Sequence, residues 1–111
     1  MVKAAAMKKR YIEFQYIGSE ASIEGVKNQM MDLAQKFFGE LGLSEAALKL
    51  VEYDENKKIG ILRCQRDYLK RVLGFLALAD SLNGVAVRFI ALRSSGTLKS
   101  LDKTDESTQD K

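Results

Sequence analysis

The stretch 46-AALKLVEYDENKKIGILRCQ-65, near the middle of the chain, decides the fold. Residues 46–53 and 59–65 are rich in branched apolar side chains, a composition that is typical of β-strands. The polar run 54–58 between them predicts a short turn. The two runs are therefore predicted to form a β-hairpin, and the class of fold depends on what lies on either side of it.

The residues before the hairpin predict one strand and one helix. Residues 10–17 alternate between apolar and polar side chains in the manner of a strand, which Gly18 ends. Ser22 is a suitable N-cap, and the apolar residues after it recur at spacings of three and four as far as Leu41. Gly42 is then expected to end this helix.

The residues after the hairpin predict a second helix and a last strand. Asp67 is expected to cap the helix, whose apolar residues extend to Leu82 and which Asn83-Gly84 stops. The last strand is predicted at 85–92. The order β-α-β-β-α-β predicts an α+β fold of the ferredoxin-like, split β-α-β type, with a four-stranded antiparallel sheet and two helices on one face.

The length of 111 residues and a content of 46% apolar and 30% charged residues are typical of one globular domain. We expect a basic N-terminal arm at 1–9, the ferredoxin-like domain at 10–101, and an acidic, disordered tail at 102–111. No apolar run approaches the ~20 residues that span a bilayer, and the N-terminus lacks an apolar segment of signal-peptide length. Together with the single cysteine, Cys64, these features predict a cytoplasmic protein.

The sequence contains no histidine, which excludes histidine-based acid–base catalysis and histidine metal sites. A single cysteine excludes a thiolate metal cluster, and Cys64 would lack the usual base if it acted as a nucleophile. Asp54 and Glu55 offer carboxylates to a metal, but hairpin turns favour such residues at this position. The sequence therefore predicts no catalytic residue, no metal site and no cofactor bound by the protein.

The net charge of +3 is unevenly distributed along the chain. Residues 1–10 contain four basic groups and no acid, and residues 59–101 contain seven basic groups against two acids. Residues 11–58 contain nine acids against five basic groups. This asymmetry predicts an electropositive region that faces a polyanion.

The segment 93-RSSGTLK-99 is a candidate anion-binding turn, and a second group of arginines lies at and just after the end of residues 59–65. Arginine binds phosphate in a bidentate manner, hydroxyls donate to phosphate oxygens, and backbone N–H groups near a glycine are accessible. A solvated charged surface remains the alternative explanation. The candidate phosphate-binding residues are Lys8, Lys9, Arg10, Arg63, Arg66, Arg88, Arg93, Ser95, Gly96, Thr97 and Lys99.

The residue pattern on the two faces of the predicted sheet indicates what kind of partner the sheet binds. RNA-recognition motifs stack bases on aromatic residues of the first and third strands, but residues 59–65 contain none, so stacking on Tyr11 or Tyr16 is not expected. Both faces of 59–65 and of 85–92 are apolar by pattern, whereas a sheet with helices on one face usually has a polar second face. We therefore expect another protein, or a second copy of the chain, to cover part of that face.

Several blocks of the sequence match one known family. They are 10-RYIEF-14, 38-FGELGLSEAALKLVEYDE-55, 59-IGILRCQR-66 and 95-SGTLKSL-101, with Asn83-Gly84 between the last two. The chain resembles the ribonuclease P protein component 2 family, the small α/β subunits of the archaeal enzyme, which have a eukaryotic nuclear counterpart. Arg93-Ser94 departs from the glycine and aliphatic residue of that family.

The resemblance implies a non-catalytic subunit. In this family the RNA subunit carries the active site and uses Mg²⁺ to remove the 5′ leader of precursor tRNA. The small protein pairs with the TIM-barrel-like protein component 3, so this protein and ribonuclease P RNA are the expected partners. By the same resemblance the candidate RNA contacts are Arg63, Arg66, Ser95, Gly96, Thr97 and Lys99.

Other classes of function stay open from the residues alone. Ferredoxin-like domains also serve as small-molecule regulatory domains that bind a ligand between paired sheets, or as general RNA-binding modules. An acylphosphatase-like enzyme is disfavoured because the phosphate-loop sequence of that family is missing near the first strand. The uneven charge favours a polyanion over a small molecule.

Overall fold

The computed structural model describes residues 8–81 and 86–97. The strands are β1 (Lys9–Ile17), β2 (Lys49–Asp54), β3 (Ile59–Gln65) and β4 (Arg88–Ser95). The helices are α2 (Ile23–Ala46) and α3 (Leu69–Leu78), with the 3-10 helices η1 (Arg66–Tyr68) and η2 (Ala79–Ser81) before and after α3. The predictions for Asn83-Gly84, for Lys99, for most of the N-terminal arm and for the acidic tail lie outside the described residues.

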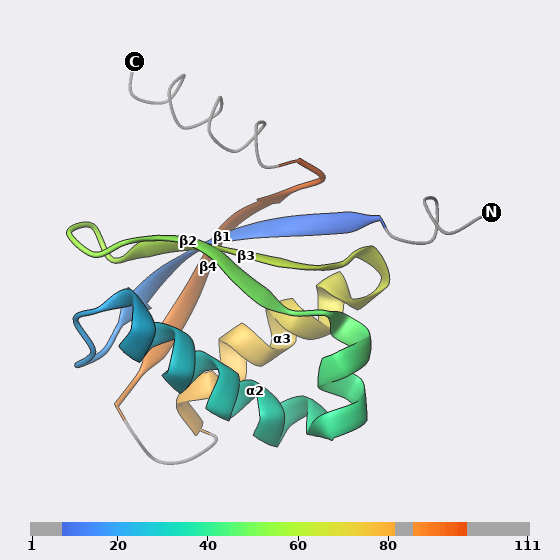
Figure 1. Ribbon diagram of the computed structural model, residues 1–111, viewed down its shortest axis with the longest axis horizontal. Helices are drawn as coiled ribbons and strands as arrows, with labels where there is room; N and C mark the ends of the chain where they lie inside the picture. Colours follow the sequence, from blue (N-terminus) through green and yellow to red (C-terminus); the bar gives the residue numbers. More distant parts are fainter. Residues whose placement is uncertain (1–7, 82–85, 98–111) are drawn as a thin grey trace.

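The predicted fold is confirmed. The four strands form one antiparallel sheet in the order β2-β3-β1-β4. Both helices lie on the same side of this sheet (Figure 1). None of the described helices is long and apolar enough to cross a membrane. We call the face of the sheet opposite the helices the open face.

The core lies between the sheet and the two helices. Ile12, Phe14 and Tyr16 of β1 are fully buried, because every second residue of this central strand points towards the helices. They belong to the same cluster as Val26 of α2 and Phe75 of α3. The alternation therefore leaves the other side chains of β1 on the open face.

The first helix is longer than predicted. Ser22 is its N-cap as expected, because the Ser22 hydroxyl accepts a hydrogen bond from the Gly25 N–H at 3.1 Å. The helix does not end at Gly42 but continues to Ala46, and Ala47 caps it in the left-handed conformation. The prediction of a strand from residue 46 is therefore wrong by three residues, since β2 begins at Lys49.

The second half of the fold also differs from the prediction in two details. Asp67 does not cap α3, because its carboxylate accepts a hydrogen bond from Arg66 and Tyr68 is the residue before the helix. The last strand begins at Arg88 and continues to Ser95, three residues further than predicted. The candidate anion-binding segment, predicted at residues 93–99, therefore begins inside the sheet rather than after it.

Candidate nucleic-acid interface

Antiparallel pairing brings most of the predicted phosphate-binding residues to one end of the sheet. Lys9 pairs with Gln65, and the Arg66 N–H donates to the Lys8 carbonyl at 3.0 Å, so the start of β1 lies beside the end of β3. Tyr11 pairs with Ser95, which places the end of β4 on the other side of β1. Three segments that are far apart in the sequence therefore meet there.

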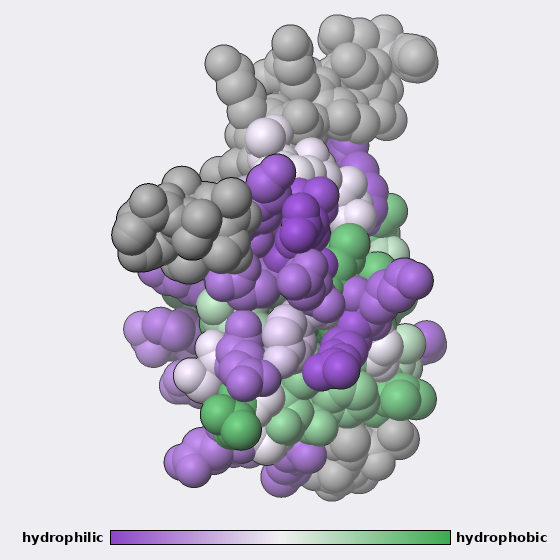
Figure 2. Space-filling model, turned by 90° about the vertical axis from the view of Figure 1, so that its right-hand side faces the viewer, coloured by the Kyte–Doolittle hydropathy of each residue, from purple (hydrophilic) through white to green (hydrophobic). Residues whose placement is uncertain are grey.

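We call this part of the molecule the basic end. It is the side of the molecule where β1 begins, and Figure 2 shows hydrophilic residues gathered across it. The opposite end of the sheet carries the β2–β3 hairpin and the carboxylates of Asp54 and Glu55. Among the described residues, the cations of the basic end are Lys8, Lys9, Arg10, Lys49, Arg63 and Arg66, followed by Lys70 and Arg71 in the first turn of α3.

Arg63 is the best placed of the predicted residues. It is half-buried on the open face, opposite Tyr11 of β1 and Lys49 of β2. Its Nε atom is buried and has no hydrogen-bond partner among the described residues. An unpaired buried donor is costly, and the guanidinium also forms no ion pair with a described residue, so its charge is not neutralised within the described part of the chain.

Arg10 and Gly96 lie together at the basic end. A Cβ atom placed on Gly96 would lie 3.3 Å from an Nη atom of Arg10, so the guanidinium packs against the glycine backbone. The Thr97 N–H donates to the Ser95 hydroxyl oxygen at 3.2 Å, which turns the chain just after β4. The Ser95 hydroxyl accepts this bond and still has its own proton to donate.

Arg93 and Arg88 are not part of this group. The Arg93 Nε atom donates to the Glu13 carboxylate at 2.7 Å, and both side chains are mostly covered. Arg88 pairs with Ile17 near the opposite end of the sheet. Their roles as RNA contacts stay predictions, and the position of Arg93 favours a structural ion pair.

The sequence did not single out Lys49, which the structure adds to the site. β2 contains a bulge between Leu50 and Glu52, and this bulge places Lys49 opposite Arg63. A hairpin without the bulge would have put Lys49 opposite Cys64, on the helix side. The only sequence signal was a lysine within the predicted strand 46–53.

The open face is less apolar than predicted. Ile61 of β3 lies on it but is only 6% exposed, and its partner Glu13 forms the ion pair with Arg93 beside it. On β4 a bulge at Leu92 places Arg93, rather than Leu92, opposite Glu13. Ile61 therefore offers little surface to a partner, and the expected protein partner on the open face stays a prediction.

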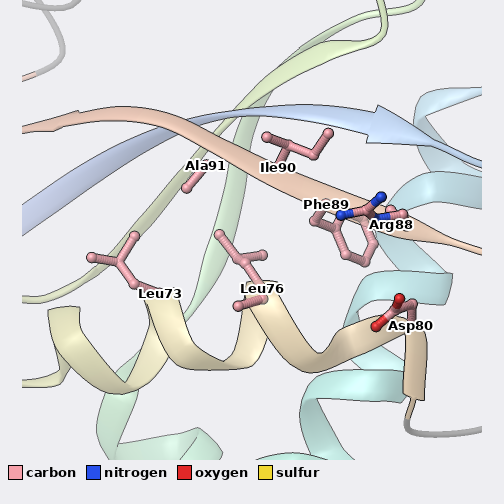
Figure 3. Close-up of a pocket in the computed structure, with 8 residues that line it drawn as sticks. Leu73, Leu76, Asp80, Arg88, Phe89, Ile90 and Ala91 are labelled. Atoms are coloured by element: carbon pink, nitrogen blue, oxygen red, sulfur yellow. The ribbon is translucent and has the colours of Figure 1, made fainter.

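The exposed apolar side chains of the sheet lie on β1 and on the edge strand β4, and Ile17, which is 49% exposed, and Ile90 are on the open face. Ile90 is 38% exposed and Leu92 is 47% exposed. A groove between α3 and β4 is lined by Leu73, Leu76 and Ala91 among others (Figure 3). This groove and edge are separate from the basic end.

The described residues provide no evident catalytic chemistry. Burial raises the pKa of the Cys64 thiol to about 11, although the nearby charges of Lys9 and Arg10 lower it in part, so the thiol is protonated at neutral pH. A hydrogen bond to Glu45 and, to a lesser extent, desolvation raise the pKa of Tyr68. Within the described ranges no cluster of three or more histidine, cysteine or acidic residues could hold a metal.

The two carboxylates of the hairpin have structural roles. Asp54 accepts hydrogen bonds from the N–H groups of Asn56 and Lys57, at 2.9 and 3.1 Å, and so forms the turn. Glu55 accepts one from the N–H of Ile23 at 2.9 Å, which joins the hairpin to the start of α2. They are therefore engaged in holding the fold.

The fold and the site define a class, a ferredoxin-like α+β protein with its cations concentrated at one end of the sheet. Residues 10–104 match the model of the Rpp14/Pop5 family. The chain belongs to this family, which confirms the resemblance found in the sequence.

Three relatives illustrate the similarity. Each is named ribonuclease P protein component 2. The protein of Pyrococcus abyssi is 36% identical over 97 residues, which cover 86% of this chain and 82% of the relative. The protein of Methanocaldococcus jannaschii is 39% identical over 93 residues, covering 83% of this chain and 68% of the relative. The protein of Saccharolobus islandicus is 33% identical over 107 residues, covering 91% and 71% respectively.

Proposed function

We propose that the chain is a non-catalytic subunit of ribonuclease P that binds the RNA of the enzyme and supports removal of the 5′ leader from precursor tRNA. The observation that carries the proposal is the basic end, where cations from β1, β2, β3 and α3 gather. The names of the relatives support it. We expect the chain to act in the cytoplasm.

The proposed role of the basic end is to neutralise phosphates. Arg63 presents a planar guanidinium that suits phosphate oxygens, and Lys9 and Lys49 add charge beside it. Bringing RNA segments together brings phosphates together, and fixed cations lower the cost of doing so. The Mg²⁺ ions of the reaction would be held by the RNA, with the protein reducing the concentration that the RNA requires.

Reconstitution tests this proposal. The chain would be added, with ribonuclease P protein component 3, to the catalytic RNA, and cleavage of precursor tRNA would be measured at limiting Mg²⁺. We expect cleavage to need less Mg²⁺ when the chain is present. We expect Arg63→Ala and Lys99→Ala to reduce this effect and to weaken RNA binding. If the wild-type chain neither bound the RNA nor changed the Mg²⁺ requirement, the proposal would be wrong.

The proposed site for component 3 is the groove between α3 and β4. Its lining is apolar at the centre, with Asp80 and Arg88 at one end (Figure 3). β4 is also an edge strand, with one side unpaired among the described strands. A protein partner that covered this edge would bury Ile90 and Leu92 without touching the basic end.

A pair of variants tests the location of the protein partner. Leu92→Ser should weaken binding of component 3 and leave RNA binding unchanged, because Leu92 is 47% exposed at the β4 edge. Leu41→Ser is the matched control, since Leu41 is 72% exposed on α2. If both variants bound component 3 with equal affinity, the β4 edge would be excluded as its binding site. Sedimentation of the chain alone would show whether a second copy occupies it instead.

A further inference from the structure

Two side chains that the fold leaves unused lie next to each other on the open face. All five phenylalanines and three of the four tyrosines of the chain make a ring contact with another aromatic ring or with an arginine. Tyr11 has no such contact and no side-chain hydrogen bond within the described part of the chain. Its cross-strand neighbour is Arg63, which forms no ion pair with a described residue.

The other tyrosine of β1 is not available to a ligand. Tyr16 is fully buried on the helix side, where its hydroxyl donates to the Gln29 side chain at 2.6 Å and accepts from the Glu20 N–H at 3.1 Å. Tyr11 is half-buried on the opposite face of the same strand. Of the two, Tyr11 alone presents its side chain on the open face.

Tyr11 and Arg63 belong to a row that crosses the whole sheet. In the order of the strands the row runs from Lys49 through Arg63 and Tyr11 to Ser95. It thus contains an ammonium group, a guanidinium plane, an aromatic ring and a hydroxyl. Side chains directly opposite each other in an antiparallel sheet have Cβ atoms ~5 Å apart, so each member is within reach of the next.

Both ends of this row depend on β-bulges in the edge strands. The bulge in β2 places Lys49 opposite Arg63, and the bulge at Leu92 of β4 places Ser95, rather than Ser94, opposite Tyr11. Bulges frequently re-aim side chains beside functional sites. Here two independent bulges turn polar groups towards the same pair of central residues.

We propose that Tyr11 and Arg63 form a two-strand stacking platform for unpaired nucleotides of RNA, with Lys49 and Ser95 at the flanking phosphates. Bases stack on aromatic rings and equally on guanidinium planes, so an arginine on β3 supplies the surface that the missing aromatic residue would have given. The platform rests on the proposed function, since it specifies the kind of RNA that the basic end binds.

The charges of the open face limit where the RNA lies. The row next to the platform contains Glu52 and the Glu13–Arg93 ion pair. A pocket at this row is lined by three carboxylates and one cation, which are Glu13, Glu52, Asp54 and Lys57. These carboxylates repel phosphates, whereas Lys9 and Lys49 attract them. The RNA is therefore expected to cross the sheet along the row and not to follow the strands towards the hairpin.

An unpaired nucleotide and a duplex can be told apart at this site. A duplex keeps its bases stacked and offers only its backbone and groove edges, so it cannot use an aromatic platform. The test uses the full chain and a short unstructured RNA that carries 2-aminopurine, a fluorescent base whose emission falls when it stacks. The same RNA annealed to its complement is the reference.

Four variants separate stacking from charge. Tyr11→Phe keeps the aromatic ring, and Tyr11→Leu replaces the ring with an aliphatic side chain. Arg63→Lys keeps the charge without the plane. Lys57→Ala removes a cation at the opposite end and is the control. Thermal unfolding of each variant establishes that the chain is folded.

We expect the wild type, Tyr11→Phe and Lys57→Ala to quench the fluorescence and to bind the single strand more tightly than the duplex. Tyr11→Leu should bind the single strand roughly tenfold more weakly, without quenching, while its duplex affinity and salt dependence are unchanged. Arg63→Lys should lose part of the quenching and keep the salt dependence.

Two other results would overturn the platform in different ways. If Tyr11→Leu bound and quenched the single strand like the wild type, the platform would be wrong while salt-dependent RNA binding, and with it the proposed function, stood. If the wild-type chain bound neither RNA, the proposed function and the platform would both be wrong.

Discussion

Cys64 shows how single residues of the sheet serve the fold rather than chemistry. Its side chain is fully buried among the core residues, and its strand pairs with β1, which carries Lys9 and Arg10. Burial disfavours the thiolate, and it outweighs the attraction of the two cations. A basic environment would by itself favour an activated thiol, but here desolvation has the larger effect on the pKa. We therefore expect Cys64 to react slowly with thiol reagents near neutral pH until the chain unfolds.

The pKa of Cys64 also predicts a pH dependence of stability. Folding raises this pKa from its ordinary value of 9.0 to about 11, so the folded state holds the proton more tightly than the unfolded state. The thiol's contribution is therefore fully present below pH 9.0 and is lost as the pH rises towards about 11. The difference in unfolding free energy between wild type and Cys64→Ala, measured in urea, should be constant below this range and shrink within it. A difference that stayed constant across the range would contradict the assignment.

At the scale of the elements, α2 contains a break that only glycine makes easily. Gly39 has φ 76° and ψ 170° inside the helix, and Phe37 and Phe38 just before it both pack on Phe75 of α3. The break lets α2 keep this packing and still turn towards the start of β2. A single glycine within an apolar helical pattern does not indicate the direction of such a break.

Two glycine variants test the break. A Cβ atom on Gly39 or on Gly74 of α3 would have no heavy atom within 4 Å, so neither substitution causes a clash. Gly39→Ala should destabilise the fold by about 1–3 kcal/mol, because alanine is strained at positive φ. Gly74→Ala should stabilise it by about 0.5–1 kcal/mol, because Gly74 lies within regular helix. Denaturant unfolding of both variants measures whether the changes in the free energy of unfolding have opposite signs. If Gly39→Ala left this free energy unchanged, the helix would straighten at no cost.

The strands show what the sequence could and could not predict. The alternation in residues 10–17 and the apolar run 59–65 located β1 and β3 within one residue, since both strands lie in the centre of the sheet and their pattern reflects burial. The bulges of β2 and β4 could not be predicted, because they depend on edge pairing and not on local preference. Without the bulge in β4, Leu92 rather than Arg93 would lie opposite Glu13 on the open face.

For the whole molecule, the sequence predicted the types of residue in the candidate site better than their arrangement. It identified Arg10, Arg63 and Ser95 as candidates. Antiparallel pairing of β1 with β3 and β4 is what brings these three residues to one end of the sheet. Arg88 looked equivalent by composition and lies at the other end. The uneven charge along the sequence thus becomes an uneven charge in space, with the hairpin carboxylates far from the basic end along the strands.

This separation of charge leads to a prediction for two lysines that the sequence alone would not distinguish. Lys49 and Lys57 are both exposed, and they lie at the beginning of β2 and in the hairpin that follows it. Lys49 is opposite Arg63 at the basic end, whereas Lys57 is in the turn that Asp54 holds. If RNA phosphates are bound only at the basic end, the two positions should behave differently.

The prediction is measured as the salt dependence of RNA binding. Lys49→Ala should weaken binding and reduce the slope of log K against log salt by about 0.7–0.9, which corresponds to the loss of one phosphate contact. Lys57→Ala should leave both the affinity and the slope close to those of the wild type, because the neighbouring carboxylates of the hairpin keep phosphates away from that end. Equal reductions in the two variants would mean that RNA senses only the net charge of the protein, and the basic end would then have no special role in binding.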